Sequence, residues 1–369
     1  MKYLLFTLFI SAITLVMGDL QTEEHYRNLD HPDPLPTNIS DIPFDSPIPV
    51  YDYQAAATFG FLALHAPNAQ HGACTTCHDV EKSGFSLKPF PIGKRREFDK
   101  YIAKYLPDIK IDVQKNGTPD FTNLAWNDNA LTHGGLGING LNKNVDRDSL
   151  IKFNPNNAKG WKGVYTQVFA AFDAHSQASL VPELRSIPYF NDLAYKAFKL
   201  KYVTDESVAV GIGITEQMFV TTEAPYQKAL RGEIKFTDLR SPEGMELFLQ
   251  PTCRNCHDGT TFAGVTKRAH KVGASETKGL FEITKRPGDM NMISIPDVYN
   301  LKHASGLGHN ESQKTLYSWL KYDHAAQSFP TVEYSNSDYR ELTKYLKHDL
   351  FDATLGQRVI KDCWLDEEK

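Results

Sequence analysis

Several features are scarce or missing in this sequence, and each absence narrows what the chain can be. It has no cluster of basic residues and a formal net charge of -5, which argues against a nucleic acid or an anionic membrane surface as a partner. Strand-like alternation of apolar and polar residues is scarce, which disfavours a fold built on β-sheet. After residue 18, no apolar run is long enough to cross a bilayer.

Cysteine is also scarce, with five residues in the whole chain. In an exported protein, an even-numbered disulfide framework would be the default expectation. Four of the five cysteines, however, fall in two C-x-x-C-H sequences, Cys74 to His78 and Cys253 to His257. The fifth, Cys363, lies near the charged C-terminus and is interpreted as a leftover thiol.

The C-x-x-C-H pattern is typical of covalent haem attachment. One helical turn places both thiols against the vinyl groups of one haem, and the next residue brings its imidazole beneath the iron. A four-cysteine zinc site, a redox-active pair and structural disulfides are the alternatives, but none of them requires His at that position. Zinc pairs also lie much closer together in sequence than these two motifs do. We therefore predict two haem c groups, bound by Cys74, Cys77, Cys253 and Cys256, with His78 and His257 as iron ligands.

The first residues, MKYLLFTLFISAITLVMG, combine Lys2 with an apolar run and small or flexible residues around Gly18. This layout is typical of a secretory signal peptide. A membrane anchor is the alternative, but about 15 apolar residues are few for a span that needs about 20. We therefore expect export to the periplasm and a mature chain that begins near Asp19.

The rest of the chain predicts a mostly α fold with long loops. Residues 19–50 are rich in proline and acid, which predicts an extended arm. Ser241-Pro242-Glu243 predicts the start of a helix that runs into the second motif, and apolar faces predict further helices after Thr204 and after Ser337. The glycine- and asparagine-rich residues 127–144 would be a loop over a cofactor, because haem supplies much of the apolar core of a small helical domain.

The two halves share more than the haem motif. In each half a proline is followed by asparagine four residues later, Pro119 by Asn123 and Pro296 by Asn300. This repeat predicts two c-type cytochrome domains of similar build, with one haem each. The expected order is a signal peptide (1–18), the arm (19–50), an N-terminal haem domain (51–203), a C-terminal haem domain (204–352) and a tail (353–369).

These residues make the chain similar to the bacterial di-haem cytochrome c peroxidase family, which includes the MauG-like enzymes. The similar segments are HGACTTCHDVEKSGF, TPDFTNLAWN, the EGMELF lead into CRNCHDGTTF, and IPDVYNL, in the family's order. The resemblance implies reduction of hydrogen peroxide to water at an N-terminal peroxidatic haem. It also implies that electrons enter at the C-terminal haem from a small c-type cytochrome or copper protein, and it is compatible with a homodimer.

The chain departs from the family's pattern at the first haem. The acid/base glutamate of the family's pocket falls near Gly140, and no acid follows until Asp146. His133, in a glycine-rich loop at the matching position, is predicted to take over proton transfer, with a plain loop histidine as the alternative. Trp126 is predicted to lie between the haems and aid electron transfer, with a core side chain as the alternative.

A second departure concerns the distal ligand of the C-terminal haem, which is Met in the family's peroxidases and Tyr in the MauG-like enzymes. The resemblance places this ligand at Asp323, whose neighbours Tyr322 and His324 are both plausible ligands. We therefore predict Tyr or His, and not Met. His309 matches a family histidine and is predicted to lie close behind the ligands of this haem.

The predicted function is that of a periplasmic, cytochrome-c-peroxidase-like oxidoreductase. A di-haem electron-transfer cytochrome without peroxidase activity is one alternative, and the missing glutamate favours it. A MauG-like enzyme that oxidises a protein residue is the other, and a Tyr322 ligand would favour it. The family's interdomain calcium would use the backbone near Ala304 and Gly306 here, so calcium is allowed as a further cofactor.

Overall fold

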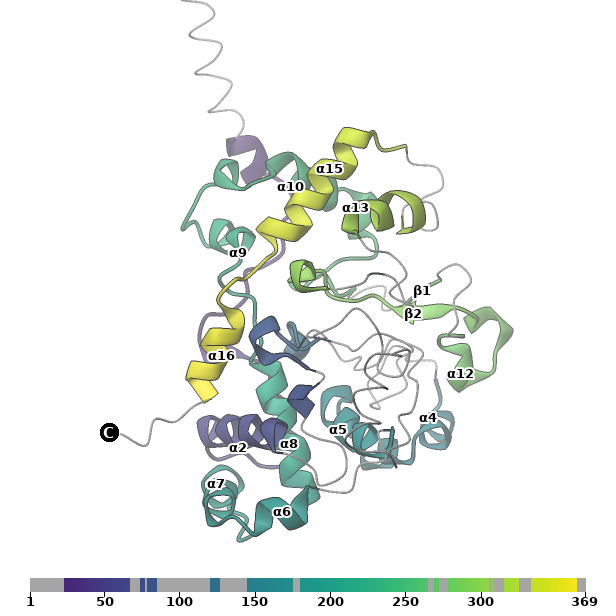
Figure 1. Cartoon of the computed structure of the whole chain (residues 1–369). Coiled ribbons are helices and arrows are strands. Elements are labelled where there is room, and N and C mark those ends of the chain that lie inside the picture. The colour runs from purple at the N-terminus through teal and green to yellow at the C-terminus, as the bar shows by residue number, and fades with distance from the viewer. Residues whose placement is uncertain are drawn as a thin grey trace, which may run out of the picture.

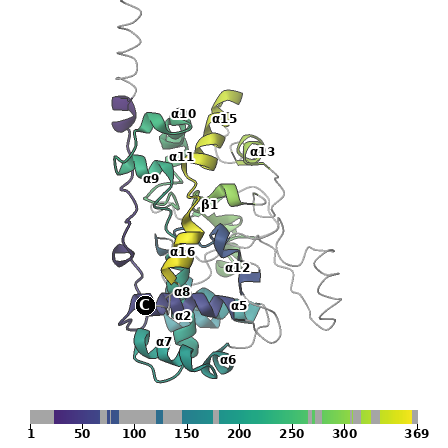
Figure 2. The same cartoon turned by 60° about the vertical axis from the view of Figure 1, so that its left-hand side comes forward.

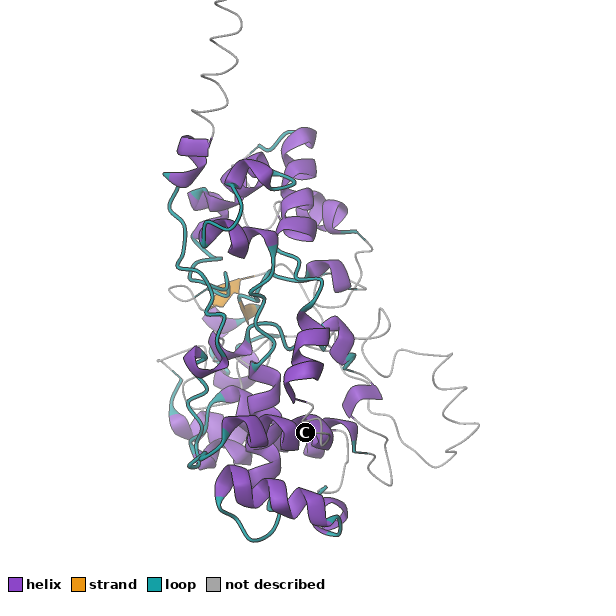
Figure 3. Cartoon of the chain, turned by 90° about the vertical axis from the view of Figure 1, so that its left-hand side faces the viewer, coloured by secondary structure: helices purple, strands orange, loops and turns teal. Residues whose placement is uncertain are grey.

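The protein is described by a computed structural model, which covers residues 23–66, 74–76, 78–84, 120–126, 145–174, 180–264, 269–271, 278–304, 307, 315–324 and 333–363. Within these residues the fold is mostly helical, which confirms the predicted class (Figure 3). Their one regular sheet is a two-stranded antiparallel ribbon, formed by β1 (Ala269–Lys271) and β2 (Met292–Ser294). None of the described helices is both long and apolar enough to cross a membrane.

The helical elements fall into three kinds. The α-helices of the described residues are α2 (Tyr53–His65), α4 (Arg147–Phe153), α5 (Gly163–Ala174), α6 (Val181–Arg185), α7 (Pro188–Phe198), α8 (Asp205–Gln217), α9 (Pro225–Leu230), α10 (Pro242–Leu249), α11 (Pro251–Arg254), α12 (Phe281–Thr284), α13 (Leu316–Ser318), α15 (Asn336–Lys344) and α16 (Leu355–Cys363). Short 3-10 helices that matter below are η1 (Ile39–Asp41), η2 (Cys74–Thr76), η3 (Val80–Lys82), η4 (Leu124–Trp126) and η8 (Leu301–His303). Two further segments, η9 (Trp319–His324) and η10 (Tyr345–Asp349), are π-helices.

The first hydrophobic core forms where α2 crosses α8 (Figure 1). The helices touch at Gly60 and Gly211, and a Cβ added to Gly60 would lie 1.9 Å from the Gly211 carbonyl oxygen. Only glycine allows this approach. The Thr215 hydroxyl donates to the Ala57 carbonyl at 2.9 Å across the same crossing. As predicted, α8 begins after Thr204, whose side chain accepts a hydrogen bond from the first turn.

The second core forms around α10 and α15 (Figure 1). A glycine again sits at the contact, because a Cβ added to Gly244 would lie 2.2 Å from the Glu341 carbonyl oxygen. The predicted cap of α10 is confirmed, since Ser241 Oγ accepts the Gly244 N–H at 3.2 Å. The helix predicted after Ser337 begins two residues earlier, because Ser335 is its cap. It continues into η10.

The N-terminal arm packs against both cores (Figure 2). Apart from a helical turn at residues 23–27 and the short η1, residues 23–50 have little regular structure. Tyr26 is buried in the second core and Phe44 in the first. Between them the Leu35 N–H donates to the Gln227 side chain at 2.8 Å, so the arm is fixed along its length.

The last described helix returns to the first half. In α16, Leu355, Val359 and Cys363 are buried in the first core, and the Cys363 Sγ lies 3.6 Å from the Met218 Sδ. Packing also joins α8 to the first core, although the sequence-based limit at residue 203 would place α8 in the second half. The domain limits stay predictions, and below the two halves are named after their cores.

The proline-asparagine repeat forms the same backbone contact in each half. The Asn123 N–H donates to the Phe219 carbonyl at 2.8 Å, and its Oδ1 accepts the N–H of the residue two positions later at 3.0 Å. Asn300 repeats this arrangement with the Leu350 carbonyl at 3.0 Å and the N–H two positions later at 2.8 Å. Both asparagines are fully buried and have positive φ, 52° and 56°. The predicted repeat is therefore a structural one.

These asparagines also join the two halves. Asn123 Nδ2 donates to Asp297 Oδ2 at 2.8 Å, and Asn300 Nδ2 donates to Ser83 Oγ at 3.2 Å. Each bond starts in one half and ends in the other. Because a buried amide without partners is costly, these reciprocal bonds fix how the two cores meet.

Candidate functional site

The first C-x-x-C-H motif lies beside the first core. Cys74 begins η2 and is half-buried against that core. The His78 N–H donates to the Cys74 carbonyl at 3.0 Å, which closes one helical turn. The His78 ring lies flat on Phe121, with ring centroids 4.8 Å apart and an interplanar angle of 14°. Cys77, the other predicted attachment residue of this half, lies outside the described residues.

The second motif follows two short helices instead of one long one. Pro251 is preceded by an extended backbone at Gln250, which separates α10 from α11. Cys253 lies in α11, and the His257 N–H donates to its carbonyl at 2.8 Å. Cys256 and His257 are buried. The one-turn closure of the first motif is thus repeated.

Both motif histidines are oriented in the same way. His78 Nδ1 donates to the Gly84 carbonyl at 3.2 Å, and His257 Nδ1 donates to the Phe262 carbonyl at 2.9 Å. A carbonyl only accepts hydrogen bonds, so each Nδ1 carries the proton and each Nε2 keeps its lone pair. Metal-binding histidines are commonly fixed by such a bond. The residues present therefore fit a haem iron.

The surroundings of the cysteines do not favour a shared zinc site. Cys74 packs against the first core and Cys253 against the second. Burial raises the pKa of the Cys253 thiol to about 12, whereas zinc binds the thiolate form. Within the described ranges, no group of three or more His, Cys, Asp and Glu could hold a metal ion. For the predicted calcium, Ala304 directly follows η8 and Gly306 is not described, so calcium stays a prediction.

The two candidate distal ligands of the second haem lie in η9 but face different surroundings. The Tyr322 side chain is 63% exposed, and Lys321 Nζ lies 4.9 Å from the centre of its ring. The His324 ring is half-buried, with its centroid 6.1 Å from that of His257 and an interplanar angle of 51°. The structure thus brings His324 to the second motif and leaves Tyr322 at the surface.

Of the other predicted residues, Trp126 is the one that the structure describes. It ends η4 and is half-buried, and its N–H donates to the Asn123 carbonyl at 3.1 Å. It therefore lies next to a contact between the two halves. His133 and His309 lie outside the described residues, and their roles stay predictions.

One neighbour of the candidate ligands was not expected from the sequence. The Trp319 ring stacks on the His324 ring, with centroids 4.4 Å apart and an interplanar angle of 25°. Residues five positions apart are not neighbours on an α-helix, where contacts follow spacings of three and four. No α-helical pattern could therefore have indicated this pair.

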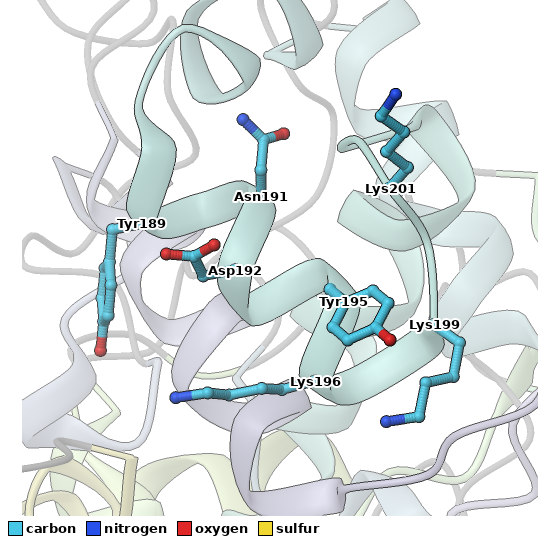
Figure 4. Close-up of a pocket in the computed structure, with 7 residues that line it drawn as sticks. All are labelled: Tyr189, Asn191, Asp192, Tyr195, Lys196, Lys199 and Lys201. Carbon is cyan, nitrogen blue, oxygen red and sulfur yellow. The ribbon is translucent and has the colours of Figure 1, made fainter.

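A surface hollow of about 700 Å³ lies elsewhere, along α7 (Figure 4). Its lining consists of residues of α7 and of the turn that follows it, namely Tyr189, Asn191, Asp192, Tyr195, Lys196, Lys199 and Lys201. None of these belongs to a haem motif or to the predicted site. The hollow and the haem chemistry are therefore separate features.

Sequence comparison links the chain to known peroxidases. The family described as di-haem cytochrome c peroxidase matches residues 67–235. The cytochrome c551 peroxidase of Pseudomonas aeruginosa is 32% identical over 140 residues, which are 35% of this chain and 40% of that protein. The cytochrome c551 peroxidase of Nitrosomonas europaea is 26% identical over 138 residues, or 36% and 41%. These alignments span about two fifths of the length of each relative.

Solved structures share the fold over more of the chain. A MauG-like protein associated with microbial copper homeostasis has a TM-score of 0.63 at 16% identity, covering 89% of this chain and 97% of that one. The diheme peroxidase BthA from Burkholderia thailandensis has a TM-score of 0.53 at 13% identity, covering 89% and 94%. Likeness at such identities shows the fold alone. With the sequence matches, it confirms that this chain is related to the di-haem cytochrome c peroxidase and MauG-like family.

Proposed function

We propose that the protein is an exported di-haem c-type oxidoreductase that reduces hydrogen peroxide to water with electrons from a small redox protein. The observation that carries this proposal is the common orientation of His78 and His257, which donate from Nδ1 to backbone carbonyls at 3.2 and 2.9 Å. This orientation leaves an unprotonated Nε2 on each ring, as an iron ligand requires.

Four cysteines would hold the two cofactors through thioether bonds: Cys74, Cys77, Cys253 and Cys256. Bound haem supplies iron that exchanges electrons and reacts with peroxide. The protein surrounds the motif histidines with aromatic rings that exclude water. In the first half Phe121 lies 5.4 Å from Phe219, and in the second Phe248 lies 5.0 Å from Phe262, between ring centroids.

Electrons would enter at the second half from a small c-type cytochrome or copper protein and pass to the first. Trp126 is proposed to aid this transfer, because it follows Asn123, whose amide bonds Asp297 of the other half at 2.8 Å. A position next to the joint between the halves suits such a role.

Peroxide would react in the first half. His133 is proposed to move the proton between the peroxide oxygens, in place of the glutamate that the sequence lacks. A positioned acid/base group contributes on the order of 100- to 10,000-fold to a rate. We therefore propose measurable but slow peroxide turnover, with a pH dependence near the imidazole pKa of about 6.5.

The related cytochrome c551 peroxidases support peroxide reduction over the alternatives. The missing glutamate keeps a di-haem electron carrier as the second candidate. A MauG-like oxidation of a protein residue is the third. Covalent haem attachment and the apolar leader support a periplasmic location, which cell fractionation would test, and a homodimer and a bound calcium ion remain part of the proposal.

The test is a steady-state assay of purified holoprotein with hydrogen peroxide and a reduced small c-type cytochrome. We expect slow oxidation of the cytochrome, and about a tenfold or greater loss in His133→Ala. His25→Ala is the control, because His25 lies on the arm with 52% of its side chain exposed. If the parent oxidises no cytochrome, the electron-carrier function replaces this proposal. Peroxide-dependent oxidation of an added protein instead would favour the MauG-like function.

A further inference from the structure

The segment that carries the two candidate distal ligands is a π-helix. The six residues Trp319–His324 form η9 directly after α13. A π-helix closes hydrogen bonds from residue i to i+5, is rare, and occurs mostly at functional sites. Trp319 and His324 are five positions apart, so this geometry places them on one side of the helix. Their stacking at 4.4 Å is a direct consequence.

The π-helix also resolves the position of the ligand. The resemblance to the family points to residue 323, with candidates on either side. A π-turn accommodates one more residue than an α-turn, which shifts later side chains by about one position. The side chain that reaches the second motif is accordingly that of His324, whereas Tyr322 is 63% exposed.

The separation of the two histidine rings is that of two ligands on one metal. Rings in direct contact here have centroids 4.4 Å apart for Trp319 and His324, and 4.8 Å for His78 and Phe121. His257 and His324 are 6.1 Å apart, which is too far for such a stack. An imidazole nitrogen binds a metal at about 2 Å, so two opposed imidazoles, each with a ring radius of about 1 Å, have centroids about 6 Å apart. Their interplanar angle of 51° is allowed, because each ring can turn about its own metal bond.

We infer that His324 is the sixth ligand of the second haem, opposite His257, and that Trp319 is a positioning residue that holds the His324 ring. This inference rests on the proposed function, because it needs a haem at Cys253, Cys256 and His257. It extends that function by assigning bis-histidine coordination to one half. His324 would keep peroxide from the second iron and restrict this half to electron transfer. It would also keep the reduction potential below that of a His/Met haem, since Met ligation raises the potential.

The test compares His324→Ala, His324→Met and Tyr322→Phe as full-length holoproteins. Haem is counted first, because fewer than two haems per parent chain would contradict the proposed function and not the ligand assignment. Ferric electron paramagnetic resonance and carbon monoxide binding to the reduced protein then report the sixth ligand. We expect His324→Ala to lose the low-spin bis-histidine signal and to bind one more equivalent of carbon monoxide per chain than the parent.

Two companion variants keep the assignment falsifiable if the Ala variant folds poorly. His324→Met should stay six-coordinate, gain the charge-transfer band of a thioether ligand and show a higher midpoint potential. Tyr322→Phe should leave every signal unchanged. Loss of the low-spin signal in Tyr322→Phe, or parental spectra and carbon monoxide binding in both His324 variants, would overturn the assignment.

The role of Trp319 has its own signature. Trp319→Ala should keep two haems and the His324 bond but change the g values of the second haem, because the His324 ring can then rotate. Trp319→Phe retains a stacking ring and should restore the parental g values. If Trp319→Ala has parental g values, the stack does not position the ligand.

Discussion

The two halves of the molecule share one framework around the motif histidine and differ in what faces that histidine. In each half a glycine sits at the contact of two long helices, a motif histidine donates to a backbone carbonyl, and a buried asparagine binds the chain after the last helix. His78, however, lies flat on Phe121 at 4.8 Å, whereas His257 has His324 opposite at 6.1 Å. Attachment is therefore common to both halves, and the distal side distinguishes them.

This difference suggests how one fold supports two roles. A half with a histidine opposite its motif histidine suits electron transfer, because the coordination of its iron need not change. A half in which loops cover the distal side can vary its chemistry without changing its core. The bonds from Asn123 and Asn300 hold the two halves in a fixed relation.

The strongest test of the comparison removes one haem at a time. Cys253→Ala should reduce the haem content from two per chain to one, while the first haem stays covalently bound, because each half has its own motif. Haem staining of denaturing gels and a haem-to-protein ratio measure this. Cys363→Ala is the matched control, since Cys363 is a buried cysteine outside both motifs. Loss of both haems in Cys253→Ala would mean that the halves do not assemble independently.

The second test asks whether the helix contacts are equivalent. Gly60→Ala and Gly244→Ala would place a Cβ 1.9 and 2.2 Å from a backbone carbonyl oxygen, so the helices must separate. We expect each to lower the free energy of unfolding by about 3 kcal/mol or more, measured by denaturant titration. Gly288→Ala is the control, because a Cβ there meets nothing within 4 Å. A large loss from only one of the two would show that the contacts are not equivalent.

The parts that the sequence predicted are those with a local chemical cause. The C-x-x-C-H motifs, the Thr204 and Ser241 caps and the proline-asparagine repeat each depend on nearby residues, and the structure contains them as helical turns, helix starts and paired contacts. The family resemblance was likewise carried by short segments around the motifs.

The parts that the sequence missed depend on contacts between distant residues or on an irregular helix. Nothing local indicates that α16 returns to the first core or that α8 packs with α2. The choice between Tyr322 and His324 needs the π-helical register, which α-helical periodicity does not reveal. Pro251 interrupts the helix that was expected to run without a break into the second motif.

A third test compares the carboxylates buried near the end of the last helix of each half. Burial raises the pKa of Glu216 to about 8, and no hydrogen bond within the described part of the chain compensates it. Burial also raises the pKa of Asp349, but two backbone N–H groups donate to it at 2.8 and 2.9 Å. The two substitutions Glu216→Gln and Asp349→Asn should therefore act in opposite directions.

The sign for Glu216 follows from its raised pKa. Between the unfolded value of 4.5 and the folded value of about 8, the folded state binds more protons, so stability falls as pH rises through this range. Glu216→Gln should remove this fall and add on the order of 3 kcal/mol at about pH 9. Asp349→Asn should cost about 2 kcal/mol at neutral pH, because an amide cannot accept both backbone bonds. Equal pH profiles for parent and Glu216→Gln, from denaturant titrations, would contradict the first expectation.

The smallest effect concerns the arm, whose two ends contact different halves. His31 stacks on Phe236 at 4.4 Å, donates from Nε2 to the Tyr26 carbonyl at 2.7 Å and accepts the Tyr226 hydroxyl at Nδ1 at 3.0 Å. Burial lowers the pKa of His31 below its usual value of 6.5.

As pH falls below about 6.5, the unfolded arm binds a proton more readily than the docked arm does, so docking weakens by about 1 kcal/mol. Hydrogen exchange at about pH 5.5, corrected for intrinsic rates, should then be faster near His31 than at about pH 7.5. The segment around Phe44 should not change, because it packs on the first core. His31→Gln should abolish the pH difference near its own position. Equal loosening around His31 and Phe44 would mean that the arm responds as one unit and that the two halves do not hold it separately.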